Sequence, residues 1–297
     1  MHAYIGELAA LGTSLSWSFG SMFFTISSRR IGSNVVNRVR LAVGLALLLI
    51  AHLIIFGRLL PNNVMAYHWF WFGLSGIIGF MIGDTLLFKS FVLMGPRLTQ
   101  LIMSTVPVFG AIIAWLFLHE ILKLTDIMAI LITLAGISWV ILGHKNDEQQ
   151  KGQFFIGIMC ALGAALCQAL GLILSKKGLS NNFSALSGNI IRIFVATTCI
   201  WIFALFRGTT ISSLKKLKDK KATLAMSGGA FFGPFVGVWL SLIAVQHTYV
   251  GIASTLMALP PIILIPLSVW IFKEKITFGA LFGTIIAVCG VALIFLL

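Results

Sequence analysis

Long apolar stretches alternate with short polar gaps along the whole of this 297-residue chain. A helix needs roughly 20 apolar residues to cross the ~30 Å hydrocarbon core of a bilayer, and ten stretches reach about that length. The pattern therefore predicts an all-α membrane protein with ten transmembrane helices. The predicted spans are 5–27, 34–56, 68–93, 96–118, 124–143, 153–175, 185–206, 222–246, 250–272 and 277–297.

The polar gap at 143–152 divides the predicted spans into two sets of five, and the two sets repeat each other. The rarer residues carry this comparison, because Leu, Ile and Ala match by chance in so apolar a chain. We predict two five-helix repeats, at 5–143 and 152–297. Matching residues lie 154 positions apart at Gly79 and Gly233, Gly83 and Gly237, Pro107 and Pro261, Glu120 and Glu274, and Gly136 and Gly290, and 152 positions apart at Asn37 and Asn189 and at Arg40 and Arg192.

The odd number of spans in each unit predicts how the two repeats lie relative to each other. A continuous chain that crosses the membrane five times begins its second unit on the opposite side, so the repeats are expected to be inverted. Many secondary transporters place such a pair around a site near the bilayer midplane and expose that site to each side in turn. The repeat therefore predicts a central cavity between the two halves.

Composition supports a lipid environment and changes how the net charge is interpreted. Charged residues make up 10% of the chain, against about a quarter in soluble domains. The formal net charge is +13, but most Lys and Arg lie in loops beside apolar spans, where they orient membrane helices. We therefore expect the lipid bilayer as a partner and no nucleic acid. The more basic loops, which the positive-inside rule places in the cytoplasm with both termini outside, are 29–33, 94–97, 144–151, 207–221 and 273–276.

Cysteine and histidine positions do not indicate a cofactor or a metal. All four cysteines fall in apolar segments without the spacing of a metal site or a redox pair, and the histidines are scattered. The segment Met1–Gly6 carries no Lys or Arg, so the first apolar stretch is expected to be a retained helix and not a cleaved signal. We expect a multi-pass protein of the cell membrane without a cofactor.

An ordered set of short motifs recurs in the two halves and resembles a known family. The motifs are GDTLLFK at 83–89, Pro-Val-Phe at 107–109, His-Glu at 119–120, Gly-Ile at 136–137, Pro261, Lys-Glu-Lys at 273–275 and Gly-Val at 290–291. Over nearly its whole length the chain resembles the EamA-type repeat of the drug/metabolite transporter superfamily. The resemblance implies a ten-helix carrier with a cavity lined by the first four helices of each half and with both fifth helices peripheral. Members of the superfamily move amino acids and related metabolites, nucleotide sugars or sugar phosphates.

Charges inside predicted spans are the strongest functional candidates, because an ionised side chain at membrane depth is costly and usually faces a cavity or a partner. Asp84 lies ~13 Å and Arg40 ~9 Å below the same surface at 1.5 Å per residue, so a guanidinium can bridge the difference. Their pair either locks two helices or lines a cavity, where Asp84 would bind a proton or a substrate ammonium. Arg40 and Arg192 would then face a substrate carboxylate or phosphate. Arg192 has no matching acid, because position 238 is Val, and Lys89 lies nearer the surface.

Pro107 and Pro261 lie near the middle of the fourth and ninth spans. Each removes a backbone hydrogen bond, which predicts a kink. Freed backbone groups are tolerated at membrane depth where they line a wet cavity, so the pair marks either a site or hinge, or a plain packing kink. Three polar residues on the same helices can supply hydrogen bonds there, namely Gln100, Ser104 and Ser254.

Two tryptophans and one glutamine are further candidates inside the spans. Trp17 and Trp239 each either stack on a substrate or pack against the core or lipid. Gln168 aligns with Trp17 and is polar deep in the sixth span. Rows of glycine in the third and eighth spans indicate close helix packing. These rows are Gly76, Gly79 and Gly83, and Gly229, Gly233 and Gly237.

Together these features favour a secondary transporter that exports or exchanges a small polar metabolite by alternating access. The first candidate substrate is an amino acid or related compound. The alternatives are a membrane-embedded lipid-modifying enzyme and a channel or scaffold. We do not expect an enzyme, because the chain has no HExxH, no GxSxG and no paired carboxylates within the predicted spans. A homodimer is a further partner that this architecture permits. The predicted substrate-binding residues are Trp17, Arg40, Asp84, Lys89, Gln100, Ser104, Pro107, Gln168, Arg192, Trp239, Ser254 and Pro261.

Overall fold

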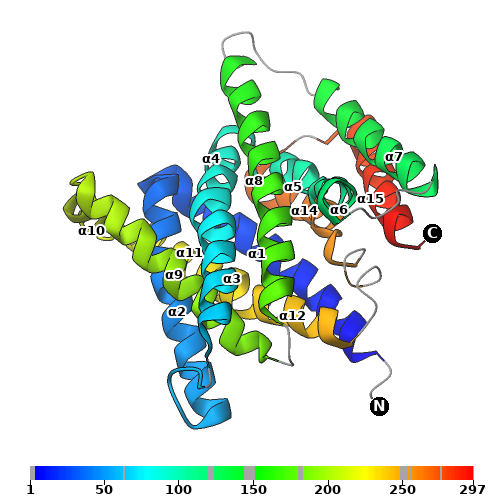
Figure 1. Ribbon diagram of the computed structural model, residues 1–297. Coiled ribbons are helices and arrows are strands. Elements are labelled where there is room, and N and C mark those ends of the chain that lie inside the picture. The colour runs from blue at the N-terminus through cyan, green and yellow to red at the C-terminus, as the bar shows by residue number, and fades with distance from the viewer. Residues whose placement is uncertain are drawn as a thin grey trace.

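The computed structural model describes residues 4–62, 64–118, 124–143, 151–179, 183–247, 253, 256–274 and 276–296, and the regular elements in them are helices (Figure 1). The first half contains α1 (Ile5–Ile31), α2 (Ser33–Phe56), α3 (Ala66–Gly76), η1 (Ile77–Gly83), α4 (Asp84–Met94), α5 (Pro96–Met103), α6 (Val106–Leu118) and α7 (Leu124–Leu142). The second half contains α8 (Lys151–Gly178), α9 (Ala185–Phe206), α10 (Thr210–Lys216), α11 (Lys220–Ala230), η4 (Phe231–Gly237), α12 (Val238–His247), α14 (Pro260–Phe272) and α15 (Phe278–Leu296).

The helices lie where the apolar pattern predicts the spans, although the structure does not confirm all ten as membrane-crossing. Six helices in the described part of the chain are long and apolar enough to cross a membrane, and three shorter apolar helices accompany them. The six are Ser33–Phe56, Ala66–Met94, Pro96–Ile113, Lys151–Gly178, Ala185–Phe206 and Lys220–Ala244.

Helix α1 is 27 residues long but is not one of these six. The face that it buries is rich in Ser and Thr, and several of their hydroxyls donate to carbonyls three or four residues earlier in the same helix. Such hydroxyls are satisfied without an outside partner, and their small side chains let neighbouring helices approach closely. The polar face of α1 therefore suits the interior of the bundle.

The third and eighth spans each contain a π-helical segment that the sequence pattern does not predict. Segment η1 joins α3 to α4, and η4 joins α11 to α12. Their residue ranges, 77–83 and 231–237, are 154 positions apart, which is also the offset of the sequence repeat. π-Helical turns are rare and often occur at functional sites. Their recurrence at matching positions makes them part of the repeated unit.

Proline interrupts two other spans more strongly than the predicted kink. Helix α5 ends at Met103, a turn follows, and α6 begins at Val106 with Pro107 as its second residue. Helix α14 likewise begins with Pro260 and Pro261. Proline has no N–H to donate, and its fixed φ suits the first turn of a helix. The two spans are therefore broken into separate helical segments rather than bent.

The packing between the two halves is nearly symmetric: equivalent helices of the two repeats make equivalent contacts. Helix α1 packs on α11, η4 and α12, whereas α8, its counterpart, packs on α3, η1 and α4. Glycine makes both crossings close: a Cβ on Gly20 would lie 3.4 Å from the backbone of Gly233, and a Cβ on Gly171 would lie 3.4 Å from that of Gly79. Each half thus places its first helix on the third span of the other, which supports the predicted pairing of repeats.

The last helix of each half lies at one edge of the molecule, where α7 and α15 pack side by side (Figure 1). A Cβ on Gly136 would be 2.4 Å from the backbone N of Ala287, and one on Gly290 would be 2.5 Å from that of Thr133. The two glycines therefore allow direct backbone contact. This is the peripheral position that the family resemblance implies for the fifth helices.

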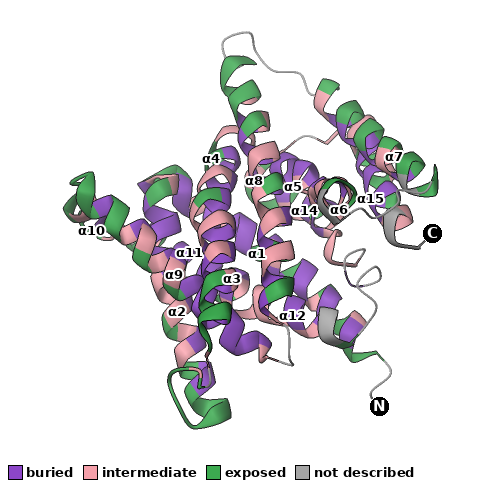
Figure 2. Cartoon of the chain, in the orientation of Figure 1, coloured by how far each residue is buried: buried purple, intermediate pink, exposed green. Residues whose placement is uncertain are grey.

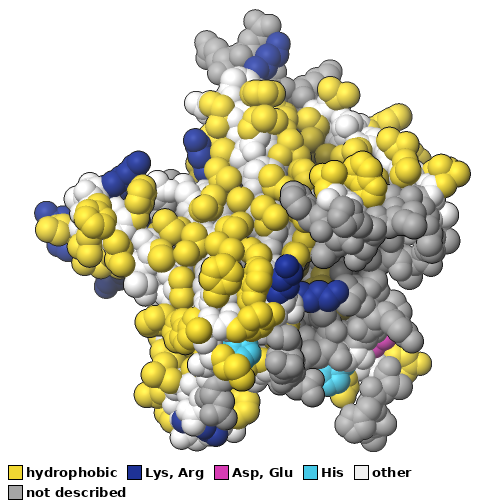
Figure 3. Space-filling view, in the orientation of Figure 1, with side chains coloured by type: hydrophobic (Ala, Val, Ile, Leu, Met, Phe, Trp, Pro, Cys, Tyr) yellow, Lys and Arg dark blue, Asp and Glu magenta, His cyan; other side chains and the backbone are white. Residues whose placement is uncertain are grey.

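Many hydrophobic side chains lie on the face of the molecule that Figure 3 shows, and buried residues gather on the inner faces of the helices (Figure 2). The loop predicted at 207–221 is wrong in one respect, because it contains the short helix α10. Asp219 caps the following helix and accepts a 2.8 Å hydrogen bond from Nε of Arg30, and this bond lowers the pKa of Asp219. The contact is thus retained at neutral pH and is lost only as acid protonates the carboxylate.

Candidate functional site

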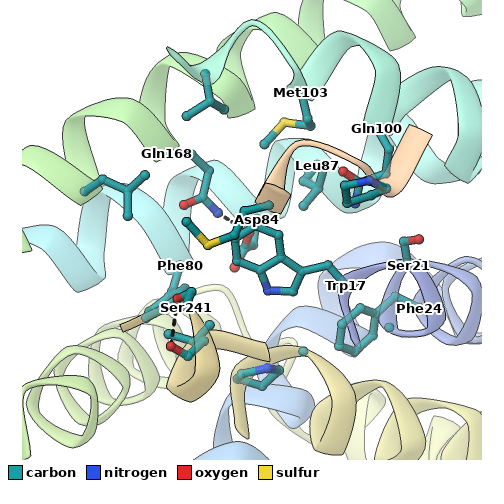
Figure 4. Close-up of a pocket in the computed structure, with 18 of the residues that line it drawn as sticks. Trp17, Ser21, Phe24, Phe80, Asp84, Leu87, Gln100, Met103, Gln168 and Ser241 are labelled. Atoms are coloured by element: carbon teal, nitrogen blue, oxygen red, sulfur yellow. Dashed lines mark hydrogen bonds between the residues drawn. The ribbon is translucent and has the colours of Figure 1, made fainter. Parts of the chain in front are cut away.

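A cavity of about 220 Å³ lies between the two halves. Its walls come from the first four spans of each half, and no described residue of α7 or α15 lines it. Drug-sized ligands occupy pockets of roughly 300–1,000 Å³, so this cavity suits a smaller solute. Nine of the twelve predicted site residues line it, several of which Figure 4 shows: Trp17, Arg40, Asp84, Gln100, Ser104, Pro107, Gln168, Arg192 and Pro261.

The predicted pair between Asp84 and Arg40 is formed inside the bundle. Asp84 is the first residue after η1, and its carboxylate accepts a hydrogen bond from an NH2 group of Arg40 on α2. The side chains of both residues are at most 6% exposed. Gln168 on α8 donates a second hydrogen bond to the other carboxylate oxygen, over 3.1 Å (Figure 4). Both oxygens of Asp84 therefore have protein partners from two different helices.

Arg40 is surrounded by groups that stabilise its charge. Its Nε donates to the side-chain oxygen of Asn37 over 3.1 Å. Its guanidinium lies 4.8 Å from the ring centre of Phe88 and 5.4 Å from that of Phe24, so both rings can make cation–π contacts. These aromatic contacts are absent from the predicted site, because apolar periodicity does not tell a ring beside a cation from a ring in the core.

Arg192 lines the same cavity with fewer partners. The residue is 3% exposed, and its guanidinium lies 4.5 Å from the ring centre of Phe80. Its Nε is buried and has no hydrogen-bond partner within the described structure. The expected asymmetry between the two arginines is therefore present: Arg40 has a carboxylate partner, and Arg192 faces the cavity with an aromatic neighbour.

Two asparagines hold the π-helical segments beside these arginines. Asn37 donates to the carbonyl of Phe80 over 3.1 Å, and Asn189 donates to that of Pro234 over 3.3 Å. A π-helical turn disturbs the regular ladder of backbone bonds, and a buried carbonyl needs a donor. The shared offset of Asn and Arg in the sequence signals this role, but only the structure shows which carbonyls they meet.

Three predicted site residues are not placed at the cavity. Lys89 is exposed and Trp239 packs on Phe235, and neither lines the cavity. Lys89 lies one turn or more beyond Asp84 on α4, where its long side chain reaches outward. Ser254 falls outside the described residues. The sequence also missed two hydroxyls and a methionine on the cavity wall, namely Ser21, Ser241 and Met103.

The two halves also meet at the more basic end of the molecule. Nε of Arg97, at the start of α5, lies 3.2 Å from a carboxylate oxygen of Glu274, which follows α14. The Arg97 side chain is 5% exposed. Glu274 therefore bridges the two repeats.

The fold and site define a class: a multi-span helical membrane protein whose two repeated halves enclose a buried, charged cavity. The sequence model of the EamA-like transporter family matches residues 4–142 and again residues 155–296. The chain therefore belongs to the EamA-like transporter family, whose members are membrane transporters.

Comparison with solved structures supports the same fold. Twenty-seven chains match, and one of them, described only as the crystal structure of a protein, has a TM-score of 0.65 and 15% identity. The alignment covers 99% of this chain and 96% of the other. At that identity the likeness concerns the fold alone. No curated protein matches the chain.

Proposed function

We propose that the protein is a secondary transporter of the cell membrane that exports or exchanges a small polar metabolite, an amino acid or related compound, by alternating access. The observation that carries the proposal is a buried cavity with three charged side chains, Arg40, Asp84 and Arg192, between two repeats of a transporter family. Charged groups inside a membrane protein are costly and generally mark a solute pathway. A purely structural bundle would not need an arginine facing an internal cavity.

The test is transport by the purified full-length protein in liposomes. Liposomes loaded with an unlabelled metabolite should take up the same labelled metabolite, and the uptake should saturate and should be faster than in unloaded liposomes. Amino acids are the first group to test, followed by other small carboxylates, nucleotides and sugar phosphates. The proposal fails if correctly folded protein gives no saturable exchange with any of these groups.

The same assay separates the carrier from the other functions considered. A channel would give flux that does not saturate and is not stimulated by solute on the opposite side. A lipid-modifying enzyme would change the composition of the liposomes. No cluster of three metal-binding side chains occurs in the part of the chain that the structure describes, so nothing there favours a metal-dependent enzyme.

A further inference from the structure

Arg192 is a cavity residue whose hydrogen-bonding groups are not all satisfied by the described protein. It is buried, lines the cavity, and has a ring contact with Phe80, while its Nε has no hydrogen-bond partner in the described structure. Asp84 attracts the charge of Arg192 but is already bonded to Arg40 and Gln168, and no salt bridge to Arg192 is formed in the described structure. A buried guanidinium without its own ion pair is costly, because the desolvation of its charge is only partly offset. Such a group is expected to meet its partner when a ligand is bound.

Comparison with Arg40 shows that the difference is specific. Arg40 bonds to Asp84 and to the side-chain oxygen of Asn37. In the second repeat Val238 stands where Asp84 would be, and the side-chain oxygen of Asn189 lacks a hydrogen-bond partner. Both of these bonds of Arg40 thus have no counterpart at Arg192, although the helices and the π-helical segments are repeated. The second repeat keeps the cation and lacks the anion.

The charges of the cavity wall indicate which ligand charge would balance Arg192. The described lining residues include two arginines and one aspartate, so the wall carries one net positive charge when all three are ionised. Asp84 is already bonded to Arg40 and Gln168. A ligand with one negative charge would neutralise Arg192, whereas a dianionic phosphate would leave an excess negative charge in a poorly solvated site. A planar carboxylate also matches the two-pronged geometry of arginine.

We propose that Arg192 binds a carboxylate group of the transported solute, and that an amino group on the solute is not required. This inference rests on the proposed transport function and names the substrate class. Gln168 lies close to the site: its Oε1 and an NH2 group of Arg192 are each 3.8 Å from the position of a Cβ on Gly79. The apolar part of the solute would then lie against Trp17 and Phe80, which also line the cavity.

The first test measures ligand binding without transport. Purified full-length protein in detergent is heated with an amino acid, the matching 2-oxo acid, the matching amine or inorganic phosphate, over a panel of side chains. We expect the amino acid and the 2-oxo acid of at least one set to raise the unfolding temperature and to compete with each other, and the amine and phosphate to have no effect. Protection by the amine, or by phosphate alone, would overturn the proposal.

Variants assign the effect to Arg192. Arg192→Gln should raise the carboxylate concentration needed for half-maximal protection roughly tenfold or more, and Arg192→Lys should raise it less, because lysine keeps the charge but loses the paired N–H groups. Arg38→Gln is the matched control: Arg38 is also buried on a membrane helix, but it bonds to Thr209 and Ser213 away from the cavity. Unchanged carboxylate binding in Arg192→Gln would contradict the inference.

A second site keeps the test independent of changes at Arg192. Val238→Asp introduces the acid that the second repeat lacks, so it should pair with Arg192 and weaken carboxylate binding, whereas Val238→Asn should weaken it less. If carboxylates bind through Arg192 but no exchange is seen, the transport proposal fails and only the carboxylate-binding site at Arg192 stands. If exchange saturates but does not depend on a carboxylate or on Arg192, the inference fails and transport stands.

Discussion

Arg40 and Asp84 come from different helices, yet each supplies what the other needs to remain charged inside the bundle. Their hydrogen bond is supplemented by Asn37 on one side and Gln168 on the other. A buried ion pair survives when its remaining hydrogen-bonding groups are satisfied. This pair meets that condition, so at the residue scale it fixes α2 against α4 and also forms part of the cavity wall.

The network predicts unequal effects of neutralising the two arginines. Asp84→Asn and Arg40→Gln each leave a buried charge unpaired and should destabilise the protein by about 3–5 kcal/mol. The double variant should cost less than the sum, and Arg192→Gln should cost less than Arg40→Gln, because the salt bridge of Asp84 is to Arg40. Thermal unfolding in detergent measures all four. Additive single effects, or a large loss for Arg192→Gln, would contradict this assignment of partners.

Glycine determines how closely the helices approach, and at the element scale Gly76 is the most constrained position beside the site. A Cβ added to this residue of α3 would lie 2.1 Å from the carbonyl oxygen of Arg192 on α9. Backbone atoms cannot move aside as a side chain can. The contact therefore sets the distance between the two helices and, with it, the position of Arg192 at the cavity.

Gly76→Ala should therefore push α3 and α9 apart. Overpacking of this kind costs about 1–3 kcal/mol, so the unfolding temperature should fall and ligand binding should weaken together. Gly110→Ala on α6 is the matched control, because a Cβ there would meet no atom within 4 Å. Equal effects of the two alanine substitutions would show that the close contact at Gly76 does not position α9.

At the scale of the whole molecule, the repeat predicts that equivalent loops lie on opposite sides of the membrane. Helices α2 and α9 are counterparts, and each is followed by an exposed arginine, Arg58 and Arg207 respectively. An inverted pair places these two residues on opposite faces, and the positive-inside rule places Arg207 in the cytoplasm. Parallel repeats would place both on the same face.

Cysteine labelling in intact cells tests this arrangement. Arg58→Cys should react with a membrane-impermeant thiol reagent added outside, and Arg207→Cys should react only after the cells are permeabilised. The unmodified chain controls for its own four cysteines, all of which lie in apolar segments. Labelling of both variants from the same side would exclude inverted repeats and with them the proposed alternating access.

The sequence by itself determined the helical class, the approximate bounds of the helices and the repeat, because apolar spans long enough to cross a bilayer and rare residues at a fixed offset are local signals. It also indicated Asp84, Arg40 and the two prolines, since charge and proline inside an apolar span are unusual. The π-helical segments depend on where backbone bonds are replaced by Asn37 and Asn189, and no local pattern records this. Lys89 and Trp239 do not line the cavity, because the direction of a side chain depends on how its helix is rotated in the bundle. Only the tertiary structure brought residues of both halves around one cavity and showed that Arg192, unlike its counterpart, has no carboxylate bonded to it.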